Sequence, residues 1–212
     1  MTARALISDV GGVLIQFDPT VFEREMALVL GTTPEIIAGF WGEHGEEERL
    51  FRAFMRGDHE PEAIRLTLER QFGIPLRNDD FYRIWISGLL GMYEETIRLL
   101  DEVRTKQSVP LVSCTDVDPV FRDHLYGPKG PLKGFFDAEV RSCDLRVAKP
   151  HGAMYETAVE RARAGAQNCV FIDDVERNVE GANQCGLRGI HHTPGDTAGL
   201  ETKLASHGFS RT

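Results

Sequence analysis

The chain is short of positive charge and of long hydrophobic runs, and each shortage excludes a class of protein. Its 212 residues include 24 lysines and arginines against 33 aspartates and glutamates, a formal net charge of −9. Affinity for a nucleic-acid backbone requires a basic surface, so we expect no nucleic-acid partner. No uncharged apolar run is long enough to span a bilayer, and Asp9 interrupts the first run too early for a secretory signal. We therefore expect a cytoplasmic protein with no membrane partner.

Cysteine is also scarce, and its spacing excludes two further classes. The four cysteines have neither the paired spacing of a metal site nor a secreted context, which predicts free thiols. The remaining composition is 42% hydrophobic and 27% charged, which is typical of a globular domain with a sizeable insertion. No pattern in the sequence specifies an oligomeric state.

The order of the predicted elements indicates an α/β fold that a helical segment interrupts. Apolar runs predict strands at 4–7, 109–113, 136–140, 169–172 and 187–190. Helical periodicity dominates from Thr20 to about Leu90, without a convincing strand. Strands separated by helices imply right-handed crossovers and a doubly wound parallel sheet. We predict a Rossmann-like core over 1–17 and 91–212, and an all-helical cap over 18–90 above the carboxyl ends of the strands.

Chemically useful groups gather at the predicted strand ends, where doubly wound sheets bind their ligands. Four segments lie there: Asp9-Val10-Gly11-Gly12, Leu111-Val112-Ser113-Cys114, Lys149-Pro150 and Ile172-Asp173-Asp174. A strand-end aspartate can attack phosphorus and form an aspartyl-phosphate, which divides one difficult step into two. Glycines after it let backbone N–H groups approach a phosphate closely. Taken alone, such an aspartate more often caps a turn.

The acidic pair Asp173-Asp174 predicts a metal site. Adjacent carboxylates repel each other unless a cation lies nearby, and Asp9, one of the pair and a backbone carbonyl suit octahedral Mg²⁺. We predict that Asp174 binds the metal directly and that Asp173 orients water. The alternative is that one of the two aspartates is the N-cap of the next helix, which would leave the other aspartate unexplained. Lys149 would neutralise phosphate and nucleophile together, and Ser113 offers a hydroxyl. A solvated lysine and a strand-end cap are the ordinary alternatives.

Together the four segments resemble the motifs of the haloacid dehalogenase-like superfamily of aspartyl-phosphate phosphatases. That family combines Asp-x-Asp-Gly-(Thr/Val), a strand-end Ser or Thr, a Lys-Pro and a terminal acidic pair, and the resemblance covers the whole chain. The stretches 149–155 and 171–182 are similar to the branch of sugar-phosphate phosphatases that includes bacterial alpha-glucose-1-phosphatase. The resemblance implies a Mg²⁺-dependent phosphatase that hydrolyses a small phosphorylated metabolite through an aspartyl-phosphate on Asp9.

The resemblance also implies a role for each matching residue. The catalytic groups would be Asp9, Lys149 and Ser113. The phosphate ligands would be Val10, Gly11, Ser113, Cys114 and Lys149. The metal ligands would be Asp9, the Gly11 carbonyl, Asp174 and Asp173.

One departure from the family pattern concerns Gly11, because the family usually has an acid–base aspartate at this position. A positioned acid–base contributes about 10²–10⁴-fold, so we expect slower chemistry or a restricted leaving group. Asp116 and His151 lie in loops from which they could donate a proton, although solvation is their more ordinary role.

Two alternatives for the function of the protein stay open. One is a weak or inactive protein that binds a phosphorylated ligand or a protein; the other is carbon–halogen hydrolysis, against which the Asp173-Asp174 pair argues.

Four residues of the predicted cap are candidate contacts for the body of the substrate: Trp41, His44, Arg52 and Arg56. Arg52 and Arg56 are one helical turn apart and share a face. The alternatives are a solvated basic edge for the arginines and a core position for Trp41.

Overall fold

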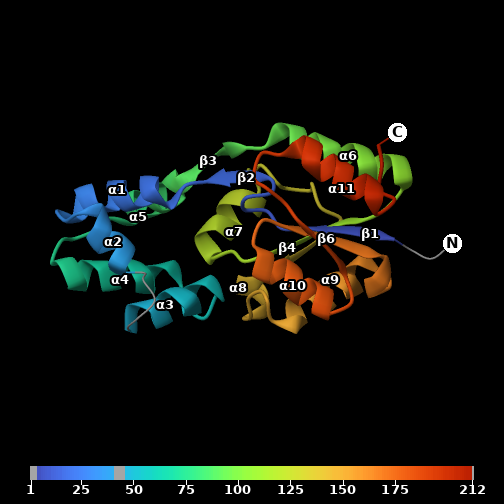
Figure 1. Cartoon of the computed structure of the whole chain (residues 1–212). Coiled ribbons are helices and arrows are strands. Elements are labelled where there is room, and N and C mark those ends of the chain that lie inside the picture. Colours follow the sequence, from blue (N-terminus) through green and yellow to red (C-terminus); the bar gives the residue numbers. More distant parts are fainter. Residues whose placement is uncertain (1–3, 41–45, 212) are drawn as a thin grey trace.

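Five parallel strands form the central sheet, in the order β5-β4-β1-β6-β7 (Figure 1). The computed structural model describes residues 4–40 and 46–211. The strands are β1 Ala5–Ser8, β4 Leu111–Thr115, β5 Ala138–Arg141, β6 Cys169–Asp173 and β7 Arg188–His191. All neighbouring pairs are parallel, which confirms the predicted α/β fold.

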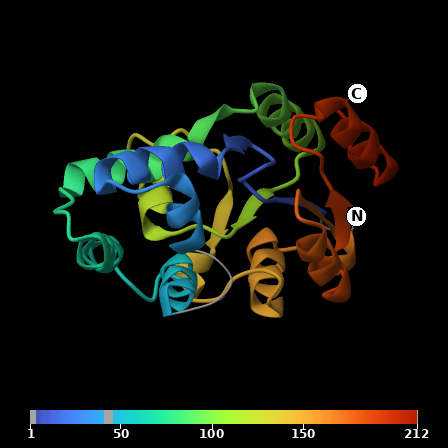
Figure 2. The ribbon, with the colours of Figure 1, turned by 60° about the vertical axis from the view of Figure 1, so that its left-hand side comes forward.

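Helices cover both faces of this sheet and enclose two hydrophobic clusters (Figures 1 and 2). One face carries α6 Glu94–Gln107, α7 Pro119–Tyr126 and α11 Thr197–Ser206. The other carries α9 Gly152–Ala162 and α10 Glu176–Gln184, and the short α8 Ser142–Leu145 follows β5. Within the described ranges, none of the helices has the length and apolar character needed to cross a membrane. All four cysteines are free, as predicted.

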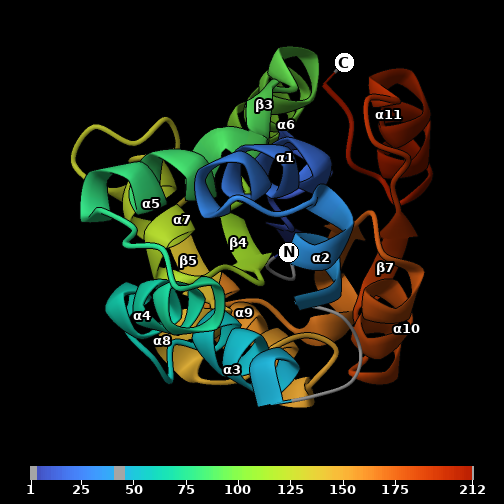
Figure 3. The same ribbon diagram turned by 90° about the vertical axis from the view of Figure 1, so that its left-hand side faces the viewer.

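Five further helices form an insertion with a hydrophobic cluster of its own. They are α1 Pro19–Leu30, α2 Pro34–Phe40, α3 Glu46–Met55, α4 Pro61–Phe72 and α5 Asn78–Trp85. Gly31 and Gly73 close α1 and α4 at positive φ, 62° and 68°, a conformation that glycine adopts without strain. Viewed from the side of the insertion, these helices lie in front of the sheet (Figure 3).

A two-stranded antiparallel ribbon joins the insertion to the sheet. Its strands are β2 Ile15–Phe17 and β3 Leu89–Met92, which leave and re-enter the core side by side. The sequence pattern did not predict β3, because a four-residue run that contains Gly91 carries little strand signal. The predicted boundary at residue 90 falls within this strand.

Two sets of contacts hold the insertion against the core. The indole Nε1 of Trp85 donates a hydrogen bond to Asp118 Oδ2, 3.0 Å away. At the second contact, Ser142 Oγ donates to the carbonyl of Met55 at 2.7 Å. Beside it, Gly57 passes so close to the Cys143 carbonyl that a Cβ would lie 2.1 Å from the oxygen, and its φ is +72°. Only glycine permits that approach.

Candidate active site

A buried lysine joins two of the predicted carboxylates. Lys149 Nζ lies 3.0 Å from Asp9 Oδ1 and 2.6 Å from Asp173 Oδ2. All three side chains are buried, with Asp9 7% and Lys149 4% exposed. They meet because β1 and β6 are neighbouring parallel strands, so Asp9 and Asp173 reach the same edge of the sheet. A charged group this deep is costly unless it is paired, and the lysine provides that pairing for both aspartates.

The adjacent aspartates Asp173 and Asp174 have different environments. Both carboxylate oxygens of Asp173 accept hydrogen bonds from protein groups, namely the Val175 N–H, the Asn178 amide and Lys149. Asp174 instead lines the cavity above the sheet. The geometry therefore favours Asp174 over Asp173 as a ligand that faces the cavity.

Gly12 brings the first loop into contact with Asp174. A Cβ at this glycine would lie 2.1 Å from Asp174 Oδ2, and the backbone φ is +69°. Any side chain here would be strained and would displace the carboxylate. The glycine thus holds the loop after Asp9 against the carboxylate that follows β6.

The carboxylates fit a divalent cation. Asp9, Asp173 and Asp174 each offer an oxygen, and the three oxygens lie within 4.8 Å of one another. Carboxylate oxygens are the donors that Mg²⁺ prefers. Asp9 Oδ1 is buried and lies 3.0 Å from the Lys149 ammonium. The carboxylate of Asp9 also lines the cavity, from which a cation could reach it.

The titration behaviour of the cluster reflects burial and an excess of negative charge. Burial raises the pKa of Asp9 to about 7, against the opposing influence of Lys149. The pKa of Asp174 is raised by burial and by the charge of Asp173. Burial alone would lower the pKa of Lys149, but Asp9 and Asp173 hold it well above its usual value. The lysine stays protonated, and bound Mg²⁺ would relieve the remaining repulsion between the carboxylates.

Side chains of β4 point alternately to the two faces of the sheet, and the predicted hydroxyl of Ser113 lies on the same face as Thr115. Ser113 is fully buried opposite Ser8, and it does not line the cavity. Its role as a phosphate ligand stays a prediction. Thr115, two residues further along the same face, lines the cavity, and its hydroxyl lowers the pKa of Asp9. The sequence analysis missed Thr115, although the strand period of two marks it.

Cys114 and Val10 turn their side chains away from the site. The Cys114 Sγ packs on the opposite face, 3.7 Å from the Met154 carbonyl, and burial raises its pKa. The Val10 side chain belongs to the hydrophobic core, while its N–H lowers the pKa of Asp9. Each residue can therefore meet a phosphate only through its backbone.

A cavity of about 540 Å³ connects the carboxylates with the helical insertion. Asp9, Gly11 and Asp174 line one end, while Phe51 and Met55 of α3 line the other. The volume is within the range of small-molecule sites, about 300–1,000 Å³. The carboxylate cluster is therefore at the floor of a site large enough for an organic ligand.

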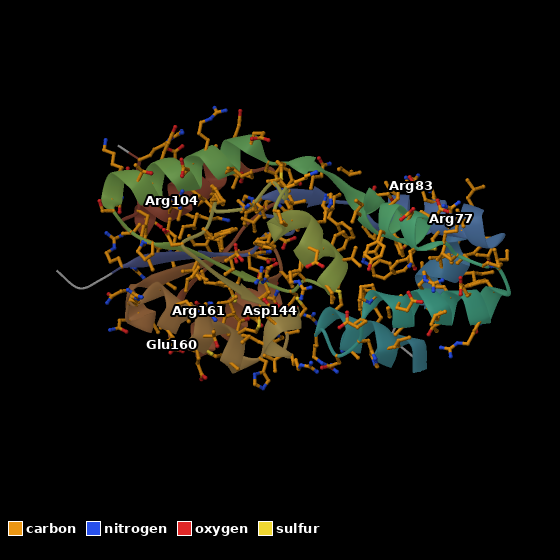
Figure 4. The ribbon with its side chains drawn as sticks, turned by 180° about the vertical axis from the view of Figure 1, so that it is seen from behind. Arg77, Arg83, Arg104, Asp144, Glu160 and Arg161 are labelled. Atoms are coloured by element: carbon orange, nitrogen blue, oxygen red, sulfur yellow. The ribbon has the colours of Figure 1, made fainter. Side chains whose placement is uncertain are left out.

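The two predicted arginine contacts do not line this cavity. Arg56 follows α3 directly and forms an ion pair with Asp58 at 2.8 Å, and Arg52 is exposed on α3. Two further arginines of the insertion, Arg77 and Arg83, lie on its outer surface (Figure 4). The other predicted contacts, at Trp41 and His44, lie outside the described residues.

The two candidate proton donors differ in position. His151 is exposed and caps α9, where its Nδ1 accepts from the Ala153 N–H at 3.2 Å. Asp116 lines the cavity, accepts from the Lys149 backbone N–H at 3.0 Å, and has a pKa that burial raises. Of the two, only Asp116 is at the site.

Comparison with known proteins relates both the sequence and the fold of this chain to one family. A family model for haloacid dehalogenase-like hydrolases matches residues 3–186. A phosphoglycolate phosphatase of Pectobacterium atrosepticum is 25% identical over 209 residues, 95% of this chain and 85% of that protein. A sesquiterpene phosphatase of Aspergillus oryzae is 27% identical over 192 residues, 91% of each chain. The structure of a Bacteroides thetaiotaomicron enzyme in complex with magnesium and inorganic phosphate has a TM-score of 0.76, with 19% identity over 92% of this chain and 96% of that one.

Proposed function

This chain belongs to the haloacid dehalogenase-like hydrolases and is a phosphatase, and we propose that it hydrolyses a small phosphate monoester by covalent catalysis on Asp9. The observation that carries this proposal is the cluster of three carboxylates around Lys149, at the floor of a cavity. The cluster combines a nucleophile, a fixed cation and ligands for a metal, which are the parts that phosphoryl transfer needs.

In the first step a carboxylate oxygen of Asp9 attacks phosphorus. The bond from phosphorus to the ester oxygen breaks, and its electron pair leaves with that oxygen. Lys149 holds the carboxylate in position and offsets the charge of the incoming phosphate. The hydroxyl of Thr115 and the N–H groups of the loop after Asp9 are positioned to receive phosphate oxygens.

In the second step water attacks the aspartyl-phosphate. The attack releases inorganic phosphate and restores the Asp9 carboxylate. Asp116 lines the cavity and is the carboxyl group available to take a proton from that water, because position 11 carries no side chain.

The cation that we propose is Mg²⁺, held by Asp9, Asp174 and the Gly11 carbonyl, with Asp173 behind them. When bound, Mg²⁺ supplies positive charge to the phosphate oxygens and offsets the carboxylates that face them. The solved structure of the Bacteroides thetaiotaomicron enzyme, which has the same fold and contains magnesium and inorganic phosphate, supports this choice.

We propose that residues 18–90 act as a cap over a core formed by 1–17 and 91–212. The cavity is lined by residues of both parts, so the cap would exclude water from the reacting groups and contact the leaving group. The relatives named above differ in the substrates for which they are named, phosphoglycolate in one and a sesquiterpene phosphate in the other. The family alone therefore does not specify the leaving group.

The test is phosphate release from p-nitrophenyl phosphate, with and without Mg²⁺. We expect Mg²⁺-dependent turnover that Asp9→Asn lowers by at least about 10⁴-fold, the scale of the loss of a catalytic nucleophile. Asp80→Asn is the matched control, because that aspartate is exposed on α5 and forms only a loose ion pair at 3.7 Å. Turnover of Asp9→Asn at the rate of wild type would overturn the proposal. Binding of Mg²⁺ and phosphate without turnover would instead support an inactive phosphate-binding protein.

A further inference from the structure

The part of the cavity away from Asp9 is walled by aromatic side chains. Three helices of the insertion contribute Phe22, Phe51 and Trp85. Their rings support one another, since the centroid of Trp85 lies 5.0 Å from that of Phe22 and 6.3 Å from that of Phe51. Trp85 is fixed further by its hydrogen bond to Asp118. The wall is therefore a packed surface, formed before any ligand enters.

The core contributes a second apolar wall. Phe17 of β2 and Phe121 of α7 both line the cavity, and their rings pack edge to face with centroids 5.8 Å apart. Phe17 is 44% exposed, so part of this wall remains open to solvent. A ligand body in the cavity would contact aromatic rings from both the insertion and the core.

The charges of this region are all negative. Among the described residues that line the cavity there is no lysine or arginine, and the lining carboxylates other than Asp9 and Asp174 are Glu23, Asp116 and Asp118. A substrate with a second anionic group would find repulsion and no cation. Glu23 and Asp116 could accept hydrogen bonds from some hydroxyl groups of a sugar, but most of the lining is aromatic or aliphatic, and the hydroxyl groups that meet it would stay unpaired, which is costly. The cavity thus selects against anionic and polyhydroxylated leaving groups.

Gly11 restricts the leaving group independently of the side chains that line the cavity. It lines the cavity next to Asp9, and it has no carboxyl group to protonate the departing oxygen. A phenol has a pKa of about 10, well below that of an aliphatic alcohol, so a phenolate leaves without a proton donor. The absence of an acid at this position therefore favours esters of phenols over esters of alcohols.

From these two observations we infer that the preferred substrates are aryl phosphates, monoesters of an uncharged aromatic alcohol. This inference rests on the proposed phosphatase function and names its substrate class. It differs from the sugar phosphate that the sequence resemblance implies. Asp9 forms a bond to phosphorus while the P–O bond to the ring breaks; the aryloxide takes a proton from solvent, and water then releases phosphate from Asp9.

The test compares kcat/KM for four esters: 2-naphthyl phosphate, phenyl phosphate, 2-naphthylmethyl phosphate and glucose 6-phosphate. We expect 2-naphthyl phosphate to exceed phenyl phosphate by about tenfold, because its second ring buries additional apolar surface. It should exceed glucose 6-phosphate by about 100-fold or more, since the cavity leaves sugar hydroxyls unpaired. 2-Naphthylmethyl phosphate has the same ring system as 2-naphthyl phosphate but an alcohol leaving group. It should have the same KM as 2-naphthyl phosphate and a lower kcat.

A variant pair separates the aromatic wall from general effects on the fold. Phe51→Ala should lower kcat/KM for 2-naphthyl phosphate by about tenfold and leave glucose 6-phosphate unchanged. Tyr82→Ala removes a ring that is 43% exposed on α5 and does not line the cavity, so neither substrate should change. Equal kcat/KM for glucose 6-phosphate and 2-naphthyl phosphate in wild type would overturn the inference and leave the phosphatase function standing. Turnover of none of the four esters would overturn both.

Discussion

Replacing Gly11 with aspartate should convert this protein into a faster phosphatase. The position is prepared for a side chain, because a Cβ at Gly11 would meet no atom within 4 Å, in contrast to Gly12 beside it. The backbone at residue 11 also stays outside the positive-φ region. The steric cost of Gly11→Asp is therefore small, and its effect on rate is set by the chemistry of the new carboxyl group.

The size of the effect follows from two opposing contributions. A positioned acid–base accelerates by about 10²–10⁴-fold, or roughly 3–5 kcal/mol. The new carboxylate also joins Asp9, Asp173 and Asp174 around a single lysine, and one like charge roughly 6 Å away costs about 3 kcal/mol at an effective dielectric constant of 20. That repulsion raises the pKa of the introduced group. A raised pKa favours the protonated form, which is the form that donates to a leaving group at neutral pH.

The assay is kcat for 2-naphthylmethyl phosphate and 2-naphthyl phosphate. Gly11→Asp should raise kcat for the alkyl ester by about 10²-fold or more and for the aryl ester by less than about tenfold, because only the alkoxide needs a proton to leave. Gly11→Asn is the control, since it has the same shape and cannot act as an acid. The reasoning is refuted if aspartate and asparagine have the same effect, or if both esters accelerate equally.

Three further predictions concern the metal and the contact between the insertion and the core. Gly12→Ala should weaken Mg²⁺ binding at least about tenfold in calorimetry, because the added Cβ displaces the carboxylate of Asp174. Gly73→Ala is the control: residue 73 also has positive φ, +68°, but has open space around it, so this variant should lose only about 1–2 kcal/mol of folding stability to left-handed strain. Equal Mg²⁺ affinity in the two variants would contradict this prediction. The affinity for Mg²⁺ should fall about tenfold for each pH unit below 7 and stay constant above pH 7, because a proton competes with the metal for the Asp9 carboxylate, whose pKa burial raises to about 7. The same affinity from pH 5.5 to 8 would contradict this prediction. Trp85→Phe removes the hydrogen-bond donor to Asp118, and burial raises the pKa of that carboxyl to about 6. At pH 8 the buried carboxylate is charged, so urea unfolding should show that the free energy of unfolding falls by about 1–3 kcal/mol. At pH 5 the carboxyl group is largely protonated, and the decrease should be smaller. An equal loss at both values would show that the hydrogen bond does not carry the effect.

The convergence of the site could be predicted from the sequence because it depends on topology. Asp9, Lys149 and Asp173 follow different strands or loops, but parallel strands bring their carboxyl ends to one edge. Apolar runs and strand-to-helix alternation were enough to predict that arrangement. The choice of Asp174 over Asp173 as the direct metal ligand stays a prediction, which the hydrogen bonds of Asp173 to Lys149 and Asn178 favour.

The lining of the cavity could not be predicted in the same way. Helical periodicity placed Arg52 and Arg56 on one face and left open which face of α3 meets the core. The structure turns Phe51 and Met55 toward the cavity, because the non-local contact of Ser142 with the Met55 carbonyl fixes the orientation of the helix. Ribbon strand β3 was missed for a related reason, since its partner β2 lies more than seventy residues earlier in the chain.

The indole of Trp85 has a practical consequence for following the protein in solution. It is 3% exposed and bonded across the boundary between insertion and core, and the chain has only one other tryptophan, Trp41. In a Trp41→Phe background, the tryptophan fluorescence therefore comes from Trp85 alone. Its emission would shift to longer wavelength whenever the two parts separate and water reaches the ring, so stopped-flow mixing could time each opening without an attached dye.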